Sequence, residues 1–240
     1  MKLILDLETN GFLDKIDLVI HCIVCKDIET GEVYSYNPNT INDALELLNK
    51  AEVLIGHNIT GFDIRVLKKV LNYEFKGKAF DTLLCSRLIW TNRLELDYKF
   101  KQMPPKLYGR HSLESWGYRL GLRKGDYQEH STFDEYNQDM LEYCQRDVEV
   151  TDLLFKEIIR SNYSEDAITL EHKFAYWIQK QEEQGIDFDE RSAETLHSIL
   201  TKKRLEISDK LSLVFSEWKK STGFKTYKRD NIKRGIKAGV

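Results

Sequence analysis

The stretch Leu3-Ile4-Leu5-Asp6-Leu7-Glu8-Thr9 begins as an apolar run and ends in two acids. It predicts a β-strand, and because successive side chains on a strand alternate between its faces, Asp6 and Glu8 should project to the same side. Two neighbouring carboxylates repel each other, and in apolar surroundings at least one of them would bind a proton. A divalent cation removes this conflict, and an all-oxygen site suits Mg²⁺ or Mn²⁺. On these residues alone, a polar strand end that faces water is an equally open interpretation.

The composition predicts an ordinary soluble protein. The chain has 240 residues, of which 41% are hydrophobic and 31% charged, so one large domain or one domain with an appendage is expected. The sequence contains no apolar run of 18 residues, and we therefore expect no membrane span. Met1-Lys2 leads directly into the first predicted strand and leaves no room for a signal peptide, which favours a reducing, cytoplasmic location.

Charge is distributed unevenly along the chain. The formal net charge is −3, and residues 219–240 carry eight Lys or Arg and one acid, a net +7 that leaves −10 for residues 1–218. A body with that charge should not hold nucleic acid strongly by phosphate attraction alone. Any nucleic acid would have to be drawn in by metals, by a basic neighbour or by a partner. The basic tail itself is either a docking surface or a solvated end.

The pair Cys22-Ile23-Val24-Cys25 has the spacing of a zinc or redox motif but lies inside a predicted strand. An offset of three places the two sulfur atoms on opposite faces of a strand, which disfavours chelation and a local disulfide. The sequence therefore predicts buried thiols rather than a zinc or redox site.

Strands and helices alternate after an initial antiparallel group. Turns at Asn10-Gly11 and Thr30-Gly31 separate the first three strands, and the turn sequence predicts that the second and third form an antiparallel hairpin. Helices and short strands then alternate, which predicts a mixed sheet covered by helices. The expected strands are 2–7, 17–27, 32–36, 53–55 and 80–82, and the expected helices include 62–70, 83–90, 112–120 and 139–161.

Two further segments shape the predicted organisation. Residues 92–111 carry Pro104-Pro105 and three lysines with little periodicity, so they predict a long surface loop of the kind that is usually functional or mobile. From Asp166 the pattern is helical, with a break at Gly185-Ile186-Asp187. We therefore place a domain boundary near residue 163, between a domain at 1–163 and a helical segment at 164–240.

Further acids stand where site residues of α/β proteins are expected. Asp63 begins the helix after Gly56-His57-Asn58, where free amides and the helix dipole hold a carboxylate. Tyr143 and Asp147 are four residues apart on the long predicted helix and share one face. Because sites in open α/β sheets lie where strands end and helices begin, these residues are expected to converge with the first two acids. Taken singly, a capping acid and an ordinary helix face remain alternatives.

The order Asp-x-Glu, then Asp63 within His-Asn-x(3)-Phe-Asp, then Tyr-x(3)-Asp resembles the DEDDy branch of DnaQ-like 3′–5′ exonucleases. The similarity extends to the proofreading domain of the T-seven-like phage DNA polymerases of family A. It is carried by Ala79-Phe80-Asp81-Thr82-Leu83, His111-Ser112-Leu113-Glu114-Ser115-Trp116-Gly117-Tyr118-Arg119-Leu120-Gly121 with Lys124-Gly125, Leu170-Glu171-His172-Lys173 and Gly185-Ile186-Asp187-Phe188-Asp189. The resemblance as a whole covers most of the chain.

The resemblance implies an α/β fold with a ribonuclease-H-like mixed sheet flanked by helices, followed by a helical C-terminal extension similar to the start of a family A polymerase domain. It implies removal of nucleotides from single-stranded or mispaired DNA 3′ ends. Asp6, Glu8 and Asp147 would hold the Mg²⁺ that activates water. Asp6 would bridge to a second Mg²⁺ held by Asp63, Mn²⁺ would substitute, and Tyr143 would orient the water.

The same resemblance suggests which residues contact the substrate. Thr9 and Phe12 follow the first acids in a loop that would touch the terminal nucleotide. Phe12 either wedges or stacks on a base or is a turn residue that covers the core, and this alternative stays open. Asn58 would bond the terminal sugar or base. His57 bonds either the substrate or local backbone, and Phe62 serves either the substrate or the core; both pairs of alternatives stay open.

The family's polymerase carries several hundred further residues with its own carboxylates. We therefore expect no polymerase activity from this chain alone, a single-stranded DNA 3′ end as substrate, and a polymerase domain or subunit as partner. The host cytoplasm is the expected location if the gene is a phage's. Two alternatives remain: an exonuclease that trims RNA 3′ ends with the same four acids, and a mainly structural subunit that docks a polymerase.

Overall fold

A computed structural model of the chain describes residues 1–122 and 133–215. The predicted basic tail at 219–240 and the pair Lys124-Gly125 lie outside the described residues. The chain divides into two compact units, Met1–Gly185 and Ile186–Val240. This division falls after the helix at 165–184, whereas the sequence places a domain boundary near residue 163; the domain boundary stays a prediction.

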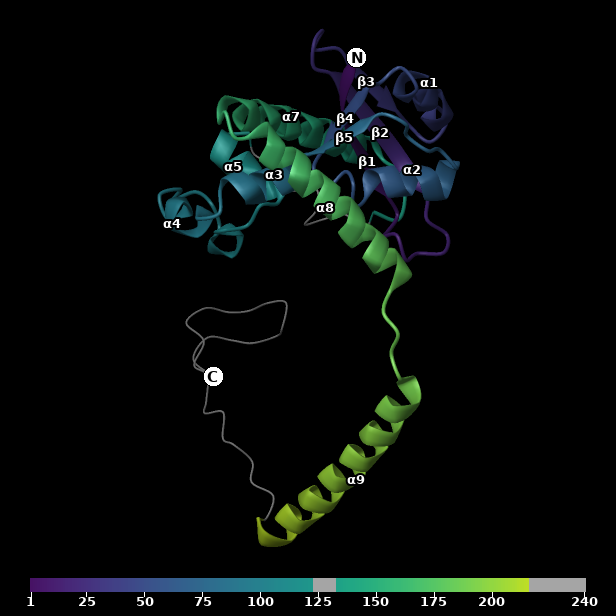
Figure 1. The fold of residues 1–240 in the computed structure, drawn as a ribbon, viewed down its shortest axis with the longest axis vertical. Coiled ribbons are helices and arrows are strands. Elements are labelled where there is room, and N and C mark those ends of the chain that lie inside the picture. The colour runs from purple at the N-terminus through teal and green to yellow at the C-terminus, as the bar shows by residue number, and fades with distance from the viewer. Residues whose placement is uncertain (123–132, 216–240) are drawn as a thin grey trace, which may run out of the picture. The chain divides into compact units, whose positions relative to one another are not determined.

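The first unit is built on a five-stranded sheet in the order β3-β2-β1-β4-β5 (Figure 1). β1 pairs antiparallel with β2 and parallel with β4, so the sheet is mixed, as the strand and helix order predicts. β2 and β3 form the predicted antiparallel hairpin, and β4 and β5 are parallel. The carboxyl ends of β1, β4 and β5 therefore meet at one edge. The strands are β1 (Lys2–Thr9), β2 (Ile20–Asp27), β3 (Val33–Tyr36), β4 (Val53–Gly56) and β5 (Lys78–Asp81).

Alternating side chains of β1 serve two separate cores. Leu3, Leu5 and Leu7 enter the core that includes α1 (Ala44–Leu48) and α2 (Asp63–Leu71). Ile4 enters the core on the other face, formed with α7 (Gln138–Arg160). Helices thus cover both faces of the sheet (Figure 1). The even-numbered positions of β1, which include both acids, belong to the face that α7 covers.

The two cysteines of β2 lie on opposite faces of the sheet, as the strand period predicts. Cys25 is in the core beside α1 and α2, and Cys22 is in the core beside α7. Burial raises the pKa of the Cys25 thiol to about 12. All four cysteines of the chain lie in the described part and are buried free thiols. A local zinc or disulfide site at this pair is excluded by their geometry.

Side-chain caps mark where several helices begin. Ser112, the predicted cap, accepts a hydrogen bond from the Ser115 amide at the start of α5 (Leu113–Leu120). Asp81 caps α3 (Thr82–Ile89), and Asn137 caps α7. A third core joins α3, α5 and α7 around the buried Trp116. The segment predicted as one long loop contains two short helices, α4 (Arg93–Asp97) and the 3-10 helix η2 (Pro105–Leu107); a second 3-10 helix, η1 (Ile41–Asp43), precedes α1.

Two long helices complete the described chain. α8 (Glu165–Gln184) packs on α3 and ends at Gly185, whose φ of 72° confirms the predicted break. His172 of α8 accepts a hydrogen bond from the Asp81 amide at 2.8 Å, which ties this helix to β5. In the second unit, α9 (Glu190–Val214) has no buried residue.

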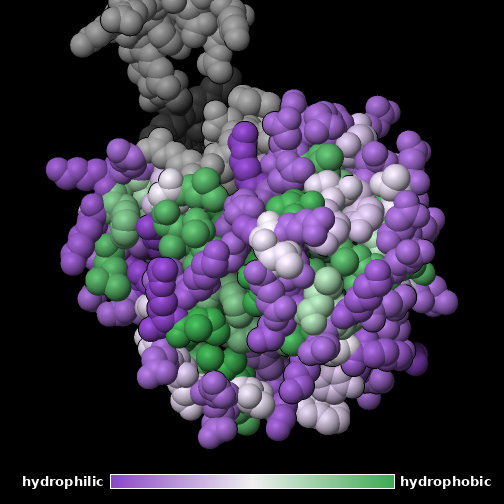
Figure 2. Space-filling view, turned by 90° about the horizontal axis from the view of Figure 1, so that it is seen from above, coloured by the Kyte–Doolittle hydropathy of each residue, from purple (hydrophilic) through white to green (hydrophobic). Residues whose placement is uncertain are grey.

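The surface mixes polar residues with apolar patches. Figure 2 shows one face on which hydrophobic residues gather in patches between hydrophilic ones. Leu170, Phe174 and Trp177 of α8 are exposed large apolar residues. Membrane-spanning helices are absent from residues 1–122 and 133–215, where no helix combines the necessary length with the necessary apolarity.

Candidate active site

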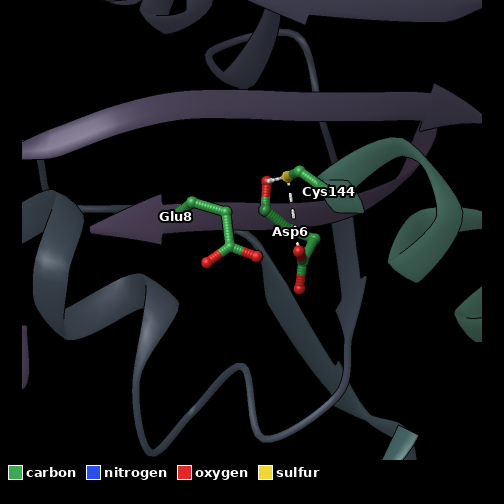
Figure 3. A group of neighbouring side chains, drawn as sticks. All are labelled: Asp6, Glu8 and Cys144. Atoms are coloured by element: carbon green, nitrogen blue, oxygen red, sulfur yellow. Dashed lines mark hydrogen bonds between the residues drawn. The ribbon is translucent and has the colours of Figure 1, made fainter. Parts of the chain in front are cut away.

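The two acids of β1 lie side by side on the face that α7 covers. Figure 3 shows the carboxylates of Asp6 and Glu8 on the same side of the strand, with Cys144 of α7 beside them. One potential ligand atom from each of these three residues lies within 4.8 Å of the others. β1 pairs Glu8 with Cys22 but Thr9 with Ile20, so the strand pair has a bulge at the end of the acid pair. Bulges strengthen strand twist and often re-aim side chains beside active sites.

Cys144 is a site neighbour that sequence reasoning missed. Its Sγ donates to the backbone oxygen of Asp6 at 3.4 Å and to Asp6 Oδ2 at 3.3 Å. Burial raises the pKa of this thiol well above its usual value, and a hydrogen bond with Cys22 and the charge of Asp6 act in the same direction. Cys144 is therefore a neutral hydrogen-bond donor to Asp6. Its place in the sequence could have indicated this role, because Cys144 directly follows Tyr143, which was predicted to face the acids.

Asp63 lies buried at the start of α2, close enough to Asp6 for their charges to interact. Burial raises its pKa well above the ordinary value, and the negative charges of Asp6 and Asp81 add to this effect. Backbone amides of Asp63 and Leu7 act in the opposite direction. The structure thus brings Asp63 to the acid pair of β1, as the order of strand ends predicts.

Tyr143 and Asp147 are both buried on α7. Burial raises the pKa of the Tyr143 phenol, and the negative charges of Asp147, Glu8 and Asp6 raise it further, in that order. The phenol therefore remains protonated at neutral pH. The same interactions show that α7 brings Tyr143 into the electrostatic field of the acids from both β1 and its own helix.

The loop between β4 and α2 is held by Asp81. The Asp81 carboxylate accepts hydrogen bonds from the amides of Asn58 and Thr60 and from the Thr60 hydroxyl, at 3.0, 3.2 and 2.8 Å. It also accepts from the Leu83 amide at 2.9 Å. Asp81 thereby fixes the loop that delivers Asp63, and its oxygens are engaged with the protein.

The predicted substrate residues have diverse surroundings. Phe12 is 78% exposed, as a residue that stacks on a base would be, whereas Phe62 packs partly buried against the core beside α2. The Thr9 hydroxyl donates to the Gly11 oxygen at 2.7 Å. His57 Nδ1 lies 3.0 Å from the Thr82 hydroxyl, and Asn58 has a left-handed backbone with a φ of 63°. Contact of these five residues with a substrate stays a prediction.

The donor set fits a hard divalent cation. Carboxylate oxygens are the ligands that Mg²⁺ and Mn²⁺ prefer, and the adjacent thiol is neutral rather than a thiolate. Burial and mutual repulsion raise the pKa of Asp63, so added positive charge at this place would be favourable. Asp6, Glu8, Asp63 and Asp147 are the residues that would hold such a group.

Comparisons with known proteins agree with this architecture. No protein-family model matches the chain. The fold is that of a solved structure described as the apo form of a nuclease, with a TM-score of 0.52, 21% identity, and coverage of 78% of this chain and 88% of that one.

The sequence has relatives among phage DNA polymerases. It is 30% identical over 269 residues to the DNA-directed DNA polymerase of Enterobacteria phage T3, covering 92% of this chain and 38% of that protein. It is 30% identical over 266 residues to the DNA-directed DNA polymerase of Escherichia phage T7, covering 91% of this chain and 38% of that protein. The resemblance to the T-seven-like phage DNA polymerases is therefore confirmed, and the chain spans well under half the length of these relatives.

Proposed function

We propose that this chain is a 3′–5′ exonuclease that removes nucleotides from single-stranded or mispaired DNA 3′ ends, as the proofreading part of a phage-type DNA polymerase. The observation that carries this proposal is the convergence of acids from β1, α2 and α7 in a relative of phage DNA polymerases. Such an enzyme acts where phage DNA is replicated, in the cytoplasm of the host.

Each residue of the site has its own role in the proposed phosphodiester hydrolysis. Two Mg²⁺ ions, or Mn²⁺ in their place, would when bound supply water activation and stabilisation of charge on the leaving 3′ oxygen. Asp6, Glu8 and Asp147 would hold one ion, and Asp63 with Asp6 would hold the other. Tyr143 stays a phenol and orients the attacking water through its hydroxyl, because its raised pKa prevents it from acting as a free base at neutral pH.

A direct assay tests the proposal. A single-stranded DNA oligonucleotide labelled at its 5′ end is incubated with the chain and Mg²⁺, with an RNA oligonucleotide of the same sequence in parallel. We expect a ladder that shortens from the 3′ end of the DNA and stops when EDTA is added. Cleavage of the RNA alone would favour the RNA-trimming alternative, and absence of metal-dependent shortening of either strand would contradict the proposal.

Replacing Tyr143 by Phe should slow cleavage by roughly ten- to a hundredfold, as expected from losing one hydrogen bond worth about 1–3 kcal/mol. Because the pKa of Tyr143 is raised, its hydroxyl does not titrate between about pH 6 and 9. The pH profiles of the two proteins should therefore run parallel, as measured by initial rates at saturating Mg²⁺. A step in the wild-type profile that the variant lacks would show that Tyr143 acts as a base.

We also propose that a polymerase domain or subunit is the partner, and α8 is the favoured contact. α8 carries the exposed residues Phe174 and Trp177. The same helix forms one wall of a groove of about 860 Å³, which β5 and α7 also line. Replacing both residues by Ser should abolish co-elution with a phage-type polymerase chain while leaving cleavage of single strands unchanged. Unchanged co-elution would exclude α8 as the contact. That the chain does not incorporate nucleotides by itself stays a prediction.

A further inference from the structure

Residues 93–110, called the basic lobe below, form a separate projection of the first unit. The lobe contains α4 and η2 and lies beside α3 and α5 (Figure 1). It carries five basic side chains and two acidic ones, in contrast to the acidic balance of residues 1–218. Nothing in the proposed hydrolysis explains this concentration of positive charge. The basic side chains are Arg93, Lys99, Lys101, Lys106 and Arg110.

The lobe is a built structure held by a buried ion pair. Asp97 is fully buried and accepts two hydrogen bonds from Arg119 of α5, at 2.9 and 2.7 Å. Asp97 also accepts from the Gly109 amide at 2.9 Å, and Arg119 donates to the Arg110 oxygen at 2.6 Å. Met103 is buried within the lobe. The charge of Asp97 is therefore neutralised internally, and the exposed charge of the lobe is predominantly positive.

The exposed surface of the lobe combines cations with an aromatic ring. Lys99, Lys101 and Lys106 are exposed, and none forms an ion pair with another residue that the structure describes. Tyr98 directly precedes Lys99 in the chain with 63% of its surface exposed, and its ring packs edge to face against Tyr108 at 5.5 Å. Cations that track phosphates and aromatic rings that stack on bases are the two elements of single-strand recognition.

Positive charge continues inward from this surface. The guanidinium of Arg93 lies 4.7 Å from the ring centre of Trp116, and that of Arg119 lies 4.8 Å from it. Burial lowers the pKa of His111 to about 4, and the charges of Arg119, Arg87 and Arg93 act in the same direction. Arg87, Arg93 and Arg119 are thus all close enough to His111 to act on it electrostatically, so cationic groups gather on the inner side of the lobe.

The lobe connects directly to the border of the acid site. It leads into α5, which packs on α7, and Glu114 in the first turn of α5 acts electrostatically on Tyr143. The start of α5 therefore lies near the acids. The lobe, which directly precedes α5 in the chain, therefore adjoins an element that borders the acid site.

We propose that the basic lobe binds the single-stranded segment that precedes the 3′-terminal nucleotides of a polynucleotide. Lys99, Lys101 and Lys106 contact its phosphates, and Tyr98 stacks on one of its bases. The direction of the strand rests on the proposed exonuclease function, whereas binding of a single strand by the lobe does not. The lobe thus supplies the basic neighbour that an acidic body needs to retain nucleic acid.

Binding without metal tests the lobe separately from catalysis. The probes are 5′-fluorescein-labelled oligodeoxythymidines of about 4 and 16 nucleotides, measured by fluorescence anisotropy in EDTA over a series of salt concentrations. Changing Lys99, Lys101 and Lys106 together to Ala should weaken binding of the longer probe at least about tenfold at low salt. The slope of log affinity against log salt should fall by about 2, since each lost phosphate contact on a single strand contributes about 0.7. Binding of the shorter probe should stay unchanged.

Matched variants separate the lobe from general charge effects. The control changes three exposed lysines elsewhere in the first unit, Lys50, Lys68 and Lys76, to Ala, and it should bind the longer probe like the wild type. Tyr98→Ala should weaken binding about fivefold or more, and Tyr98→Phe should retain wild-type affinity because the ring can still stack. Thermal melting of each variant verifies that it folds.

Three results would overturn the proposal: unchanged binding by the triple lobe variant, an equal loss in the control, or equal affinity of the wild type for a fully paired duplex. An oligouridine arm identifies whether the strand is DNA or RNA. If lobe variants lose binding but no nuclease activity exists, the exonuclease proposal fails and the lobe stands. If the chain degrades DNA but lobe variants bind and degrade the longer probe normally, the proposal for the lobe is refuted and the exonuclease proposal stands.

Discussion

Changing Asp147 to Asn should lower the rate of 3′-end hydrolysis about a thousandfold or more. The proposed role of this carboxylate is to hold a cation whose stabilisation of the transition state is worth several kcal/mol, and each 1.36 kcal/mol is a tenfold change in rate. Asn has nearly the same shape but no charge. Initial rates on a 5′-labelled single strand at saturating Mg²⁺ measure the effect.

The Asp147→Asn variant should nevertheless fold. Asn has nearly the same volume and shape as Asp, so the substitution neither opens a cavity nor overpacks this buried position of α7. Asp139→Asn, an exposed change in the first turn of the same helix, is the matched control and should retain wild-type rates. Full magnesium-dependent cleavage by the Asp147 variant would refute the assignment of the site.

The largest expected loss of stability comes from replacing Arg119 by Met. The side chains of Arg119 and Asp97 are only 3% and 0% exposed, and the change would leave the Asp97 carboxylate buried without its cation. Removing one partner of a buried ion pair typically costs about 3–5 kcal/mol of unfolding free energy. Arg119 also stacks on Trp116, so lost packing adds to the effect. Urea denaturation at pH 7 measures the change.

The double variant Asp97→Leu with Arg119→Met should recover much of that loss, because it removes the stranded charge as well. Burial alone would raise the pKa of Asp97, but hydrogen bonds from Arg119 and Gly109 outweigh it and hold the pKa below its usual value. The pair therefore stabilises the wild type above about pH 4, and this contribution is lost as the pH falls through the lowered pKa. A penalty for Arg119→Met that is as large at pH 2 as at pH 7 would argue against this account.

Local periodicity accounts for the parts of the structure that were predictable. The period of two along β1 placed Asp6 and Glu8 together, and the spacing of four on a helix placed Tyr143 and Asp147 on one face. Cys144 was missed because its contact with Asp6 depends on how α7 lies across β1, which no local pattern encodes.

The same reasoning explains the segment at 92–111. Its short helices are anchored by a pairing of Asp97 with Arg119, and these residues are far apart in sequence with unremarkable surroundings. Pro104-Pro105 and the scattered lysines predict a loop because no regular hydrophobic period runs through this twenty-residue stretch, which contains its own turns. The prediction that residues 92–111 are functional is supported by the positive charge of the lobe and by the exposed ring of Tyr98.

The division of β1 between two cores limits how this protein can vary in length. Leu3, Leu5 and Leu7 face one core while Ile4 and the two acids face the other. An insertion or deletion of one residue within the strand would exchange the two sets, turning leucines toward the acid site and carboxylates into an apolar core. Evolution, natural or in the laboratory, can therefore change the side chains of this strand but not its residue count. Length differences among related chains should fall in the turns beyond it.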